Sequence, residues 1–350
     1  MRHSKVRQED IARVVGVSVS TVSRVLSGAP GISPATTQKV LRAAADLGTP
    51  ITLPGDGGGL VTHRMERALL FLKQVDLNSG SGSIYHFVMT GIQKAARKYG
   101  LRVELALLGE DGEIPERILG GAETGVLFAG VDPSPKLLKK LRETGNSAVL
   151  VNGLDPSMTH DQVAPNNYQG GWLAAQHFLD MGHRRILQLG TARRLTLAAR
   201  TQGFLDAIAQ AGMDGLDCDF IEIGNVTEQA AQVALKQILS ESAFPYTAVF
   251  CSADIVALTV MQELRMREID VPREVSLLGF NGLPLAEFSS PLLSTLYVDW
   301  EYLGHEAIRL LCTRSAEPDR PTQQVQTQVI LKQAETVADL SNRSDFNALG

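Results

Sequence analysis

Cysteine is scarce in this chain of 350 residues, and its placement excludes two kinds of structure. The three cysteines stand far apart in apolar stretches: Cys218, Cys251 and Cys312. Their odd number argues against a disulfide framework, and no two of them have the spacing of metal ligands. We therefore expect no stabilising disulfide and no metal site.

Long apolar runs and enzymatic signatures are also missing. No stretch approaches the roughly 20 residues that a membrane-spanning helix needs, and the polar N-terminus is unlike a signal peptide. The sequence has no phosphate-binding glycine loop and no nucleophile motif, and its seven histidines are scattered. These absences predict a cytoplasmic protein with no membrane partner, no catalytic residues and no cofactor.

The segment 14–27 has the pattern of two short helices joined by a tight turn. One helix ends at Gly16, and a second begins one turn later with Ser18 at its cap. The second helix has an apolar face at helical spacing, formed by Val22, Val25 and Leu26. Its other face carries small, hydroxylated or cationic side chains and no carboxylate: Val19, Ser20, Thr21, Ser23 and Arg24. Such a helix can lie against a phosphate backbone without repulsion, which favours a helix-turn-helix over an ordinary helical hairpin.

The residues around this segment complete a small basic unit. Ser33 and Pro34 form an N-cap followed by proline at the first helical position, which predicts a third helix that ends at Gly48. Residues 1–42 carry seven Lys/Arg and two Asp/Glu, a charge of +5. Because the whole chain carries −5, the remainder carries −10. A basic head on an acidic body predicts a protein whose head alone binds nucleic acid.

Residues 49–65 are rich in proline and glycine and are expected to form a linker. Beyond them, short apolar runs alternate with helical stretches. Strands are predicted at 68–72, 103–108, 125–129, 148–151, 185–189, 220–223, 248–251 and 275–280, and helices at 90–99, 135–143, 171–181, 200–211, 228–241 and 255–267. This alternation predicts an α/β body of two doubly wound parallel-sheet lobes after the all-α head. We expect a head at 1–48, a core at 66–340 and a tail at 341–350, with the polar stretch 338–350 loosely held.

Two sets of motifs follow one another along the chain. In the head they are Ala12, Gly16-Val17-Ser18, Thr21-Val22-Ser23-Arg24-Val25-Leu26, Ser33 and Thr36. In the body they are Leu179, Gly182-His183-Arg184-Arg185-Ile186, Arg200, Gly203-Phe204, Asp254, Ala257, Val271-Pro272, Leu278-Gly279-Phe280 and Pro291. In this order and spacing the chain resembles the LacI/GalR family of transcriptional regulators. The resemblance implies a homodimer with a DNA-binding head, a hinge and a periplasmic-binding-protein-like core that senses a small molecule. Its first lobe would hold about 66–164 and 297–328, and its second about 165–296 and 329–340.

The resemblance also implies roles for residues of the head. The base-reading positions fall on Val19 and Ser20, and Arg24 is the best candidate for a bidentate contact to guanine. The positions that contact DNA phosphates fall on Ser18, Thr21, Ser23, Ser33 and Thr36. For Ser33 and Thr36, helix capping is an equally good explanation, and both roles can coexist.

The hinge departs from the family pattern. The family has an Ala-Arg-x-Leu-like segment whose leucine wedges into the minor groove. Here residues 55–59 stand at that place, with Leu53 and Leu60 as the nearest apolar residues. Either the hinge helix is displaced to 60–65, or the protein binds DNA without the wedge. We favour the second, because three successive glycines cost roughly 3 kcal/mol of helix propensity.

The effector site implied by the resemblance also departs from the usual pattern. Arg200 stands at the position of the family's ligand-clamping arginine. Asparagine replaces the aspartate of relatives at Asn152, Asn167 and Asn281. An amide is uncharged and donates as well as accepts, which favours an anionic effector such as a sugar acid or phosphorylated sugar. The alternative is a neutral polyol, with the neighbouring Arg193 and Arg194 only a solvated surface pair.

Two further residues belong to the expected effector site. Asp254 is retained and would orient the site or bond a ligand hydroxyl. Tyr85, like Phe87 near it, would stack on a sugar ring, and a place in the core is an equally good explanation for both aromatic residues. The sequence thus predicts a regulator, and most simply a repressor, of a palindromic double-stranded DNA operator. The alternative is a regulator of the same fold that answers to a protein partner, with a vestigial small-molecule site. Apolar residues at 69–72, Ile92 and 256–261 are candidates for the dimer interface, although the sequence alone does not separate them from residues of the core.

Overall fold

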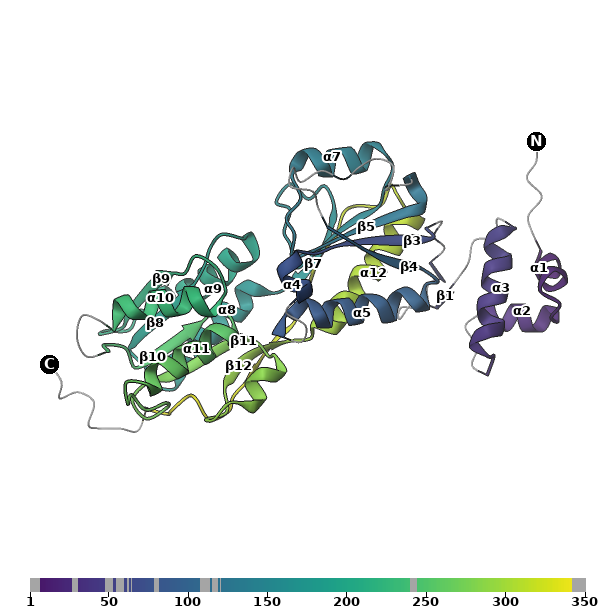
Figure 1. Cartoon of the computed structure of the whole chain (residues 1–350). Helices are drawn as coiled ribbons and strands as arrows, with labels where there is room; N and C mark the ends of the chain where they lie inside the picture. Colours follow the sequence, from purple (N-terminus) through teal and green to yellow (C-terminus); the bar gives the residue numbers. More distant parts are fainter. Residues whose placement is uncertain are drawn as a thin grey trace.

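A computed structural model describes residues 7–26, 31–47, 53–54, 60–61, 63, 65–78, 82–107, 114, 119, 121–239 and 244–341. Figure 1 shows a helical head and a two-lobed α/β core. The predicted fold class is confirmed: each lobe is built on a six-stranded, mainly parallel sheet.

The head consists of α1 (Gln8–Val15), α2 (Val19–Leu26) and α3 (Pro34–Asp46). Helix α1 ends because Gly16 adopts a left-handed conformation, with φ of 72°, which glycine accepts without steric cost. One apolar face of each helix meets the other two in a small core, which includes Ile11, Val22, Val25 and Val40. The predicted helix-turn-helix is therefore present.

Two short strands follow the head, β1 (Leu53–Pro54) and β2 (Leu60–Val61), and they pair antiparallel with Leu53 opposite Val61. The alternative of a hinge helix displaced to 60–65 is wrong, since Leu60 and Val61 form a strand. The glycine-rich stretch 55–59, on which the other alternative depends, lies outside the described residues.

The sheet of the first lobe has the strand order β13-β7-β6-β5-β3-β4, and all its neighbouring strands are parallel. The strands are β3 (Arg67–Phe71), β4 (Arg102–Ala106), β5 (Thr124–Ala129), β6 (Ala148–Val151), β7 (Asp161–Pro165) and β13 (Gln324–Thr327). Helices α5 (Ile84–Lys98) and α12 (Trp300–Ala316) pack on one face, and α7 (Pro135–Glu143) packs on the other. The smaller elements are α4 (Gln74–Asn78) and the 3-10 turn η2 (Gly121–Glu123).

The sheet of the second lobe has the order β14-β12-β11-β10-β8-β9, in which only the edge strand β14 runs antiparallel. The strands are β8 (Arg185–Gly190), β9 (Asp217–Glu222), β10 (Ala248–Cys251), β11 (Ser276–Asn281), β12 (Ser294–Val298) and β14 (Val329–Lys332). Helices α8 (Asn167–Asp180) and α9 (Leu195–Ala211) cover one face, and α10 (Glu228–Ile238) and α11 (Asp254–Arg265) cover the other. The 3-10 turn η3 (Pro284–Phe288) follows β11.

The chain crosses between the lobes three times: after β7, after β12 and after β13. The second crossing falls after Val298 rather than before residue 297, because Tyr297 and Val298 still pair with Ile330 and Val329 of the second sheet. Each crossing lies beside the carboxyl end of a parallel strand. This arrangement makes the carboxyl ends of the two sheets face each other at a junction, called the crevice below, which is the place where α/β proteins bind ligands.

The C-terminal segment is held more firmly than we expected. The amide of Ala338 donates to the Ser276 hydroxyl at 2.9 Å, and the amide of Leu340 donates to the Met181 carbonyl at 2.7 Å. Residues 338–341 therefore lie against the second lobe, and the expectation that they are loosely held is wrong. Residues 342–350 lie outside the described part.

The apolar residues that we considered for a dimer interface belong to the core. Leu69, Leu70, Phe71 and Leu72 are at most 3% exposed, since β3 is covered on both faces. Ile92 is buried too, as are Val256, Ala257, Val260 and Met261. The candidate interface was wrong, and any interface lies elsewhere on the molecule.

Candidate functional site

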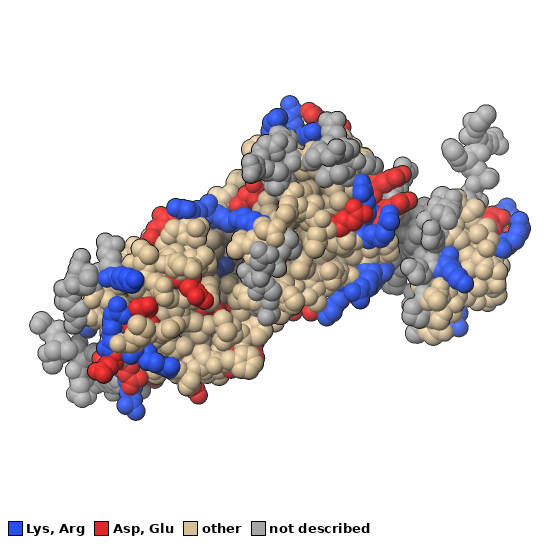
Figure 2. Space-filling model, in the orientation of Figure 1, with Lys and Arg blue, Asp and Glu red and all other residues tan. Residues whose placement is uncertain are grey.

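Helix α2 presents the predicted base-reading side chains to solvent. Its apolar residues Val22 and Val25 face the head's core, whereas Ser20, Ser23 and Arg24 are exposed and Val19 is 42% exposed. Figure 2 shows basic side chains on the surface of the head. Because α2 contains no carboxylate, its outer face can approach a polyanion closely.

Two of the predicted phosphate-contacting serines cap helices. The Ser18 hydroxyl accepts a hydrogen bond from the Thr21 amide at 3.1 Å at the start of α2. The Ser33 hydroxyl accepts one from the Thr36 amide at 3.2 Å at the start of α3. In both pairs the hydroxyl groups are also bonded to each other, at 2.8 Å and 2.9 Å. These contacts fix the ends of both helices, and the exposed hydroxyls stay on the surface that would meet DNA.

Arg200 lies in the crevice on α9 and is only 4% exposed. Its Nε and Nη2 donate to Oδ1 of Asn167 at 3.2 and 2.6 Å, and its Nη1 donates to the carbonyl of Ser252. The guanidinium lies 3.3 Å from the centroid of the Phe280 ring. Burial lowers the pKa of Arg200 to about 9, against the opposing charge of Asp254, so the group stays cationic at neutral pH. The structure thus brings Arg200 and Asn167 together. Ser252 and Phe280, which also contact Arg200, were not predicted as site residues from the sequence.

Asp254 is buried beside this arginine at the start of α11. Its Oδ1 accepts a hydrogen bond from the Thr295 hydroxyl at 2.5 Å, and its Oδ2 accepts one from the Leu283 amide at 2.8 Å. Burial raises the pKa of Asp254 to about 7, although these hydrogen bonds and Arg200 act to lower it. Both carboxylate oxygens are engaged, so Asp254 is placed to orient the loop after β11.

Tyr85 and Asn152 form the facing wall in the first lobe. Asn152 Nδ2 donates to the Tyr85 hydroxyl at 3.0 Å, and both side chains are buried. Asn152 has φ of 53° and Asn281 has φ of 114°, a region in which asparagine is enriched. At these two positions the backbone conformation by itself explains why asparagine is present. The replacement of aspartate at Asn152 and Asn281 is therefore weaker support for an anionic effector.

Arg194 crosses the crevice, unlike its neighbour Arg193. The Arg194 guanidinium, from the start of α9, forms a bidentate ion pair with Asp132 after β5, at 2.6 and 2.7 Å. It also donates to the Asn152 carbonyl at 2.9 Å. Burial acts to lower the pKa of Arg194, but the hydrogen bond and charge of Asp132 outweigh it and raise that pKa. Arg193 is exposed, so the alternative of a solvated pair applies to Arg193 only.

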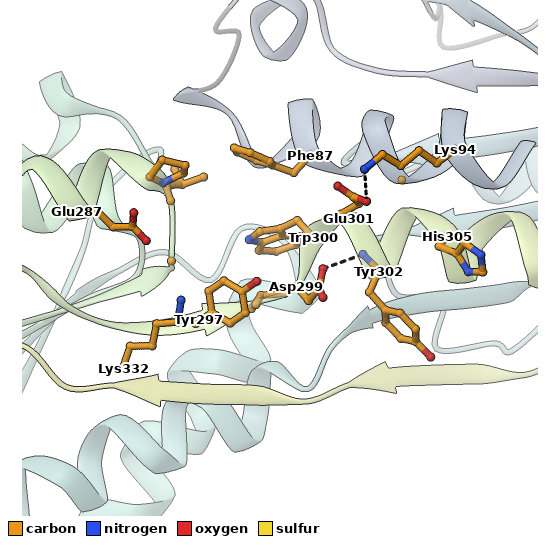
Figure 3. A pocket seen from close by; sticks show the side chains of 15 residues that line it. Phe87, Lys94, Glu287, Tyr297, Asp299, Trp300, Glu301, Tyr302, His305 and Lys332 are labelled. Carbon is orange, nitrogen blue, oxygen red and sulfur yellow. Dashed lines mark hydrogen bonds and ion pairs between the residues drawn. The ribbon is translucent and has the colours of Figure 1, made fainter. Parts of the chain in front are cut away.

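A cavity of about 630 Å³ lies on the flank of the lobe junction (Figure 3). Its walls come from α5, α12, η3 and the ends of β12 and β14, and include Phe87, Lys94, Glu287, Tyr297, Asp299 and Trp300. An ion pair of 2.6 Å joins Lys94 to Glu301 at its edge. None of the six predicted effector residues lines this cavity, so it is separate from the crevice that holds Arg200.

Two family models match the chain. The model "Bacterial regulatory proteins, lacI family" matches residues 9–48, which cover α2, α3 and all but the first residue of α1. The model "Periplasmic binding protein-like domain" matches residues 175–334. The chain is a LacI-family DNA-binding regulator.

Relatives of this LacI-family regulator match it over most of its length. It is 29% identical to the HTH-type transcriptional regulator CelR of Thermobifida fusca, over 87% of this chain and 91% of CelR. It is 28% identical to the HTH-type transcriptional repressor PurR of Photobacterium profundum, over 87% of this chain and 91% of PurR. A solved structure of a CelR–cellobiose complex aligns with a TM-score of 0.68 at 26% identity, covering 95% of this chain and 99% of that one.

Membership in this family makes the protein a non-enzymatic regulator. Among the described residues, no group of three or more His, Cys, Asp or Glu is arranged to hold a metal ion. Within the same part of the chain, the helices are too short or too polar to span a membrane. The family match assigns DNA binding to the head.

Proposed function

We propose that this LacI-family regulator is a repressor whose affinity for a DNA operator is controlled by a sugar-like effector bound between the lobes. The observation that carries the effector site is the convergence of polar side chains from both lobes on one crevice. Tyr85 and Asn152 come from the first lobe, and Asn167, Arg194 and Arg200 come from the second. A ligand that contacts both walls stabilises one arrangement of the lobes over others, which is the requirement for control at a distance.

In the head, we propose that Val19, Ser20 and Arg24 contact bases. Arg24 is suited to guanine, and the methyl groups of Val19 are suited to thymine. We assign the phosphate contacts to the hydroxyl groups of Ser18, Thr21, Ser23, Ser33 and Thr36. The exposure of α2 supports this division, since its outer face carries every one of the proposed base contacts.

We propose that the effector is a sugar or sugar derivative bound by Tyr85, Asn152, Asn167, Arg200, Asp254 and Asn281. The bound cellobiose of the CelR structure supports a saccharide. Arg200 and Asn167 would bind ligand hydroxyls, while Asp254 orients the loop beneath them. The two arginines in the crevice favour an acidic or phosphorylated sugar over a neutral one.

We infer a homodimer, because one head offers too few contacts for specific recognition and a pair matches a palindromic operator. The exposed apolar residues on η3 and the loop that follows it support an interface there. Phe288 is 84% exposed, and Leu285 and Leu292 are 46% and 37% exposed. Three large exposed apolar side chains within one short segment support a surface that a partner would cover.

We further propose that the chain divides at its linker, 49–65, into a DNA-binding head and an effector-binding core. A regulator of chromosomal DNA in bacteria acts in the cytoplasm, and we place this one there because of its DNA-binding head.

A ligand screen tests the effector site. Purified protein is heated with neutral sugars, sugar acids and sugar phosphates, in parallel with R200K and R200A, and operator binding is followed by fluorescence anisotropy. A ligand at a hundredfold over its Kd adds about 2.7 kcal/mol of stability, so a clear rise in Tm is expected for the wild type. R200K should keep the fold and lose most of this rise, because lysine cannot make the two-pronged contact to Asn167.

The result also separates the main alternatives. A rise with sugar acids or phosphates supports an anionic effector, and a rise with neutral sugars alone keeps the regulator but contradicts an anion. No rise with any ligand, together with operator affinity that changes when a partner protein is added, would replace the effector proposal by the protein-partner alternative.

A further inference from the structure

The two arginines in the crevice differ in how firmly the protein holds them. Arg200 is surrounded within the second lobe by Asn167, the Ser252 carbonyl and the Phe280 ring. Arg194 instead reaches across to the first lobe, where Asp132 accepts its Nε and Nη2 hydrogens. The partners of Arg200 belong to the packed core of one lobe, whereas the only charged partner of Arg194 among the described residues is the Asp132 carboxylate of the other lobe.

Exposure shows which member of the Arg194–Asp132 pair can leave. The Arg194 side chain is 17% exposed and is also bonded to the Asn152 carbonyl and, at 3.4 Å, to the Tyr85 hydroxyl. The Asp132 side chain is 54% exposed, and within the described residues Arg194 is its only ion-pair partner. Separating the pair returns the Asp132 carboxylate to water at small cost, while the Arg194 guanidinium would remain mostly buried without a charged partner.

We propose that Asp132 occupies the place of an acidic group of the effector, and that a carboxylate or phosphate on a sugar binds Arg194 by displacing it. The exchange keeps the guanidinium paired with an anion, so it avoids the cost of leaving a buried charge alone. A neutral hydroxyl cannot replace a bidentate carboxylate, so the pair excludes neutral groups from this position. This inference rests on the proposed effector function and specifies the ligand class of that site. Arg194 and Asp132 thereby determine specificity, and Asp132 competes with the ligand.

Inorganic phosphate is the probe that tests this exchange. Tm is measured against phosphate concentration, at constant pH and ionic strength with chloride as reference, and without DNA. In D132N the internal competitor is gone, and the phosphate concentration for half of the stabilisation should fall about tenfold if the pair is closed about nine-tenths of the time. The double variant D132N/R194Q should lose the phosphate-specific stabilisation, which also corrects for general salt effects.

R193Q is the matched control, because it removes the neighbouring exposed cation and leaves the cross-lobe pair intact. It should respond to phosphate as the wild type does. The inference is overturned if D132N gains nothing over the wild type, or if its gain persists in the double variant. Operator binding by the same proteins is measured separately, so a failure of the DNA-binding proposal shows in that assay while the phosphate response still reports on Arg194.

Discussion

Arg194 and Arg200 lie within two turns of each other near the start of α9. Their different environments show that the residue type alone does not determine which partners an arginine binds. The family resemblance placed Arg200 in the crevice, at the position of the ligand-clamping arginine. It could not find Asp132, Ser252 or Phe280, since these meet the arginines only after the two lobes fold. A signal was present: Ser252 directly follows the parallel strand β10, and Asp132 stands three residues after the parallel strand β5, in the region where ligands bind in this fold class.

A matched pair of serine variants tests the head. S18A removes the cap of α2 and should lower the free energy of unfolding of the head by about 1 kcal/mol. S23A, at an exposed position within α2, should leave that stability within about 0.5 kcal/mol of the wild type. Both should weaken operator binding, and thermal unfolding with fluorescence anisotropy separates the two effects. Equal loss of stability in both variants would contradict a capping role.

His183 gives the second lobe a pH dependence. Burial lowers its pKa to about 4, and its Nδ1 lies 3.1 Å from the Thr247 hydroxyl. The unfolded chain binds a proton near pH 6.5 and the native protein does not, so stability is full above that pH and falls as the pH drops toward 4. Between pH 7.5 and 5, the wild type should lose about 2 kcal/mol more than H183Q in urea unfolding.

The exposed His86 provides the control for this measurement. H86Q should keep the pH dependence of the wild type. If H183Q shows the same slope as the wild type, His183 is not the group that titrates.

At the scale of elements, the pattern of apolar residues predicted the strands that form continuous apolar runs and the helices that have one apolar face. Strand β5 (Thr124–Ala129) is buried throughout and was predicted within one residue. Strand β13 (Gln324–Thr327) was missed because it lies at a sheet edge and carries polar residues. Helix α12 was missed because it buries much of its circumference, including Trp300 and Glu306, and so lacks a clear polar face.

Glycine residues allow the two helices that cover one face of each sheet to pack closely against each other. A Cβ at Gly203 of α9 would overlap the Tyr168 carbonyl of α8, and one at Gly304 of α12 would overlap the Val88 carbonyl of α5. G203A should therefore lower the free energy of unfolding by about 3 kcal/mol, through displacement of α8 against α9. Urea unfolding measures this. G82A, where the added methyl meets open space, should change stability by less than about 0.5 kcal/mol, and equal effects would contradict the steric explanation.

At the scale of the whole molecule, the dimer was implied by family resemblance, but its surface could not be read from the sequence. Apolar residues of core strands and of an interface look alike along a chain, and only exposure separates Leu70 at 1% from Phe288 at 84%. The boundaries of the two lobes could not be read from the sequence either, because they depend on which of the two sheets a strand joins.

A charged residue at the proposed interface tests the dimer. F288D places a carboxylate in the apolar segment on η3, and the dimer should weaken at least about tenfold by sedimentation velocity, since buried aromatic anchors dominate such interfaces. Operator affinity should fall with it, because two heads bind one site. V233D, on an α10 side chain that is 70% exposed, should leave both unchanged, and a dimer that survives F288D would place the interface elsewhere.

The second crossing between the lobes has an optical consequence. The chain has two tryptophans, and Trp300 lies at that crossing, 4% exposed, with its indole Nε1 donating to the Asn281 carbonyl of the other lobe at 3.0 Å. A lobe movement that separates the start of α12 from the end of β11 breaks this hydrogen bond and changes the access of water to the indole. With Trp172 replaced by phenylalanine, the intrinsic fluorescence of the protein would come from Trp300 alone, and its emission would follow lobe movement without an added dye.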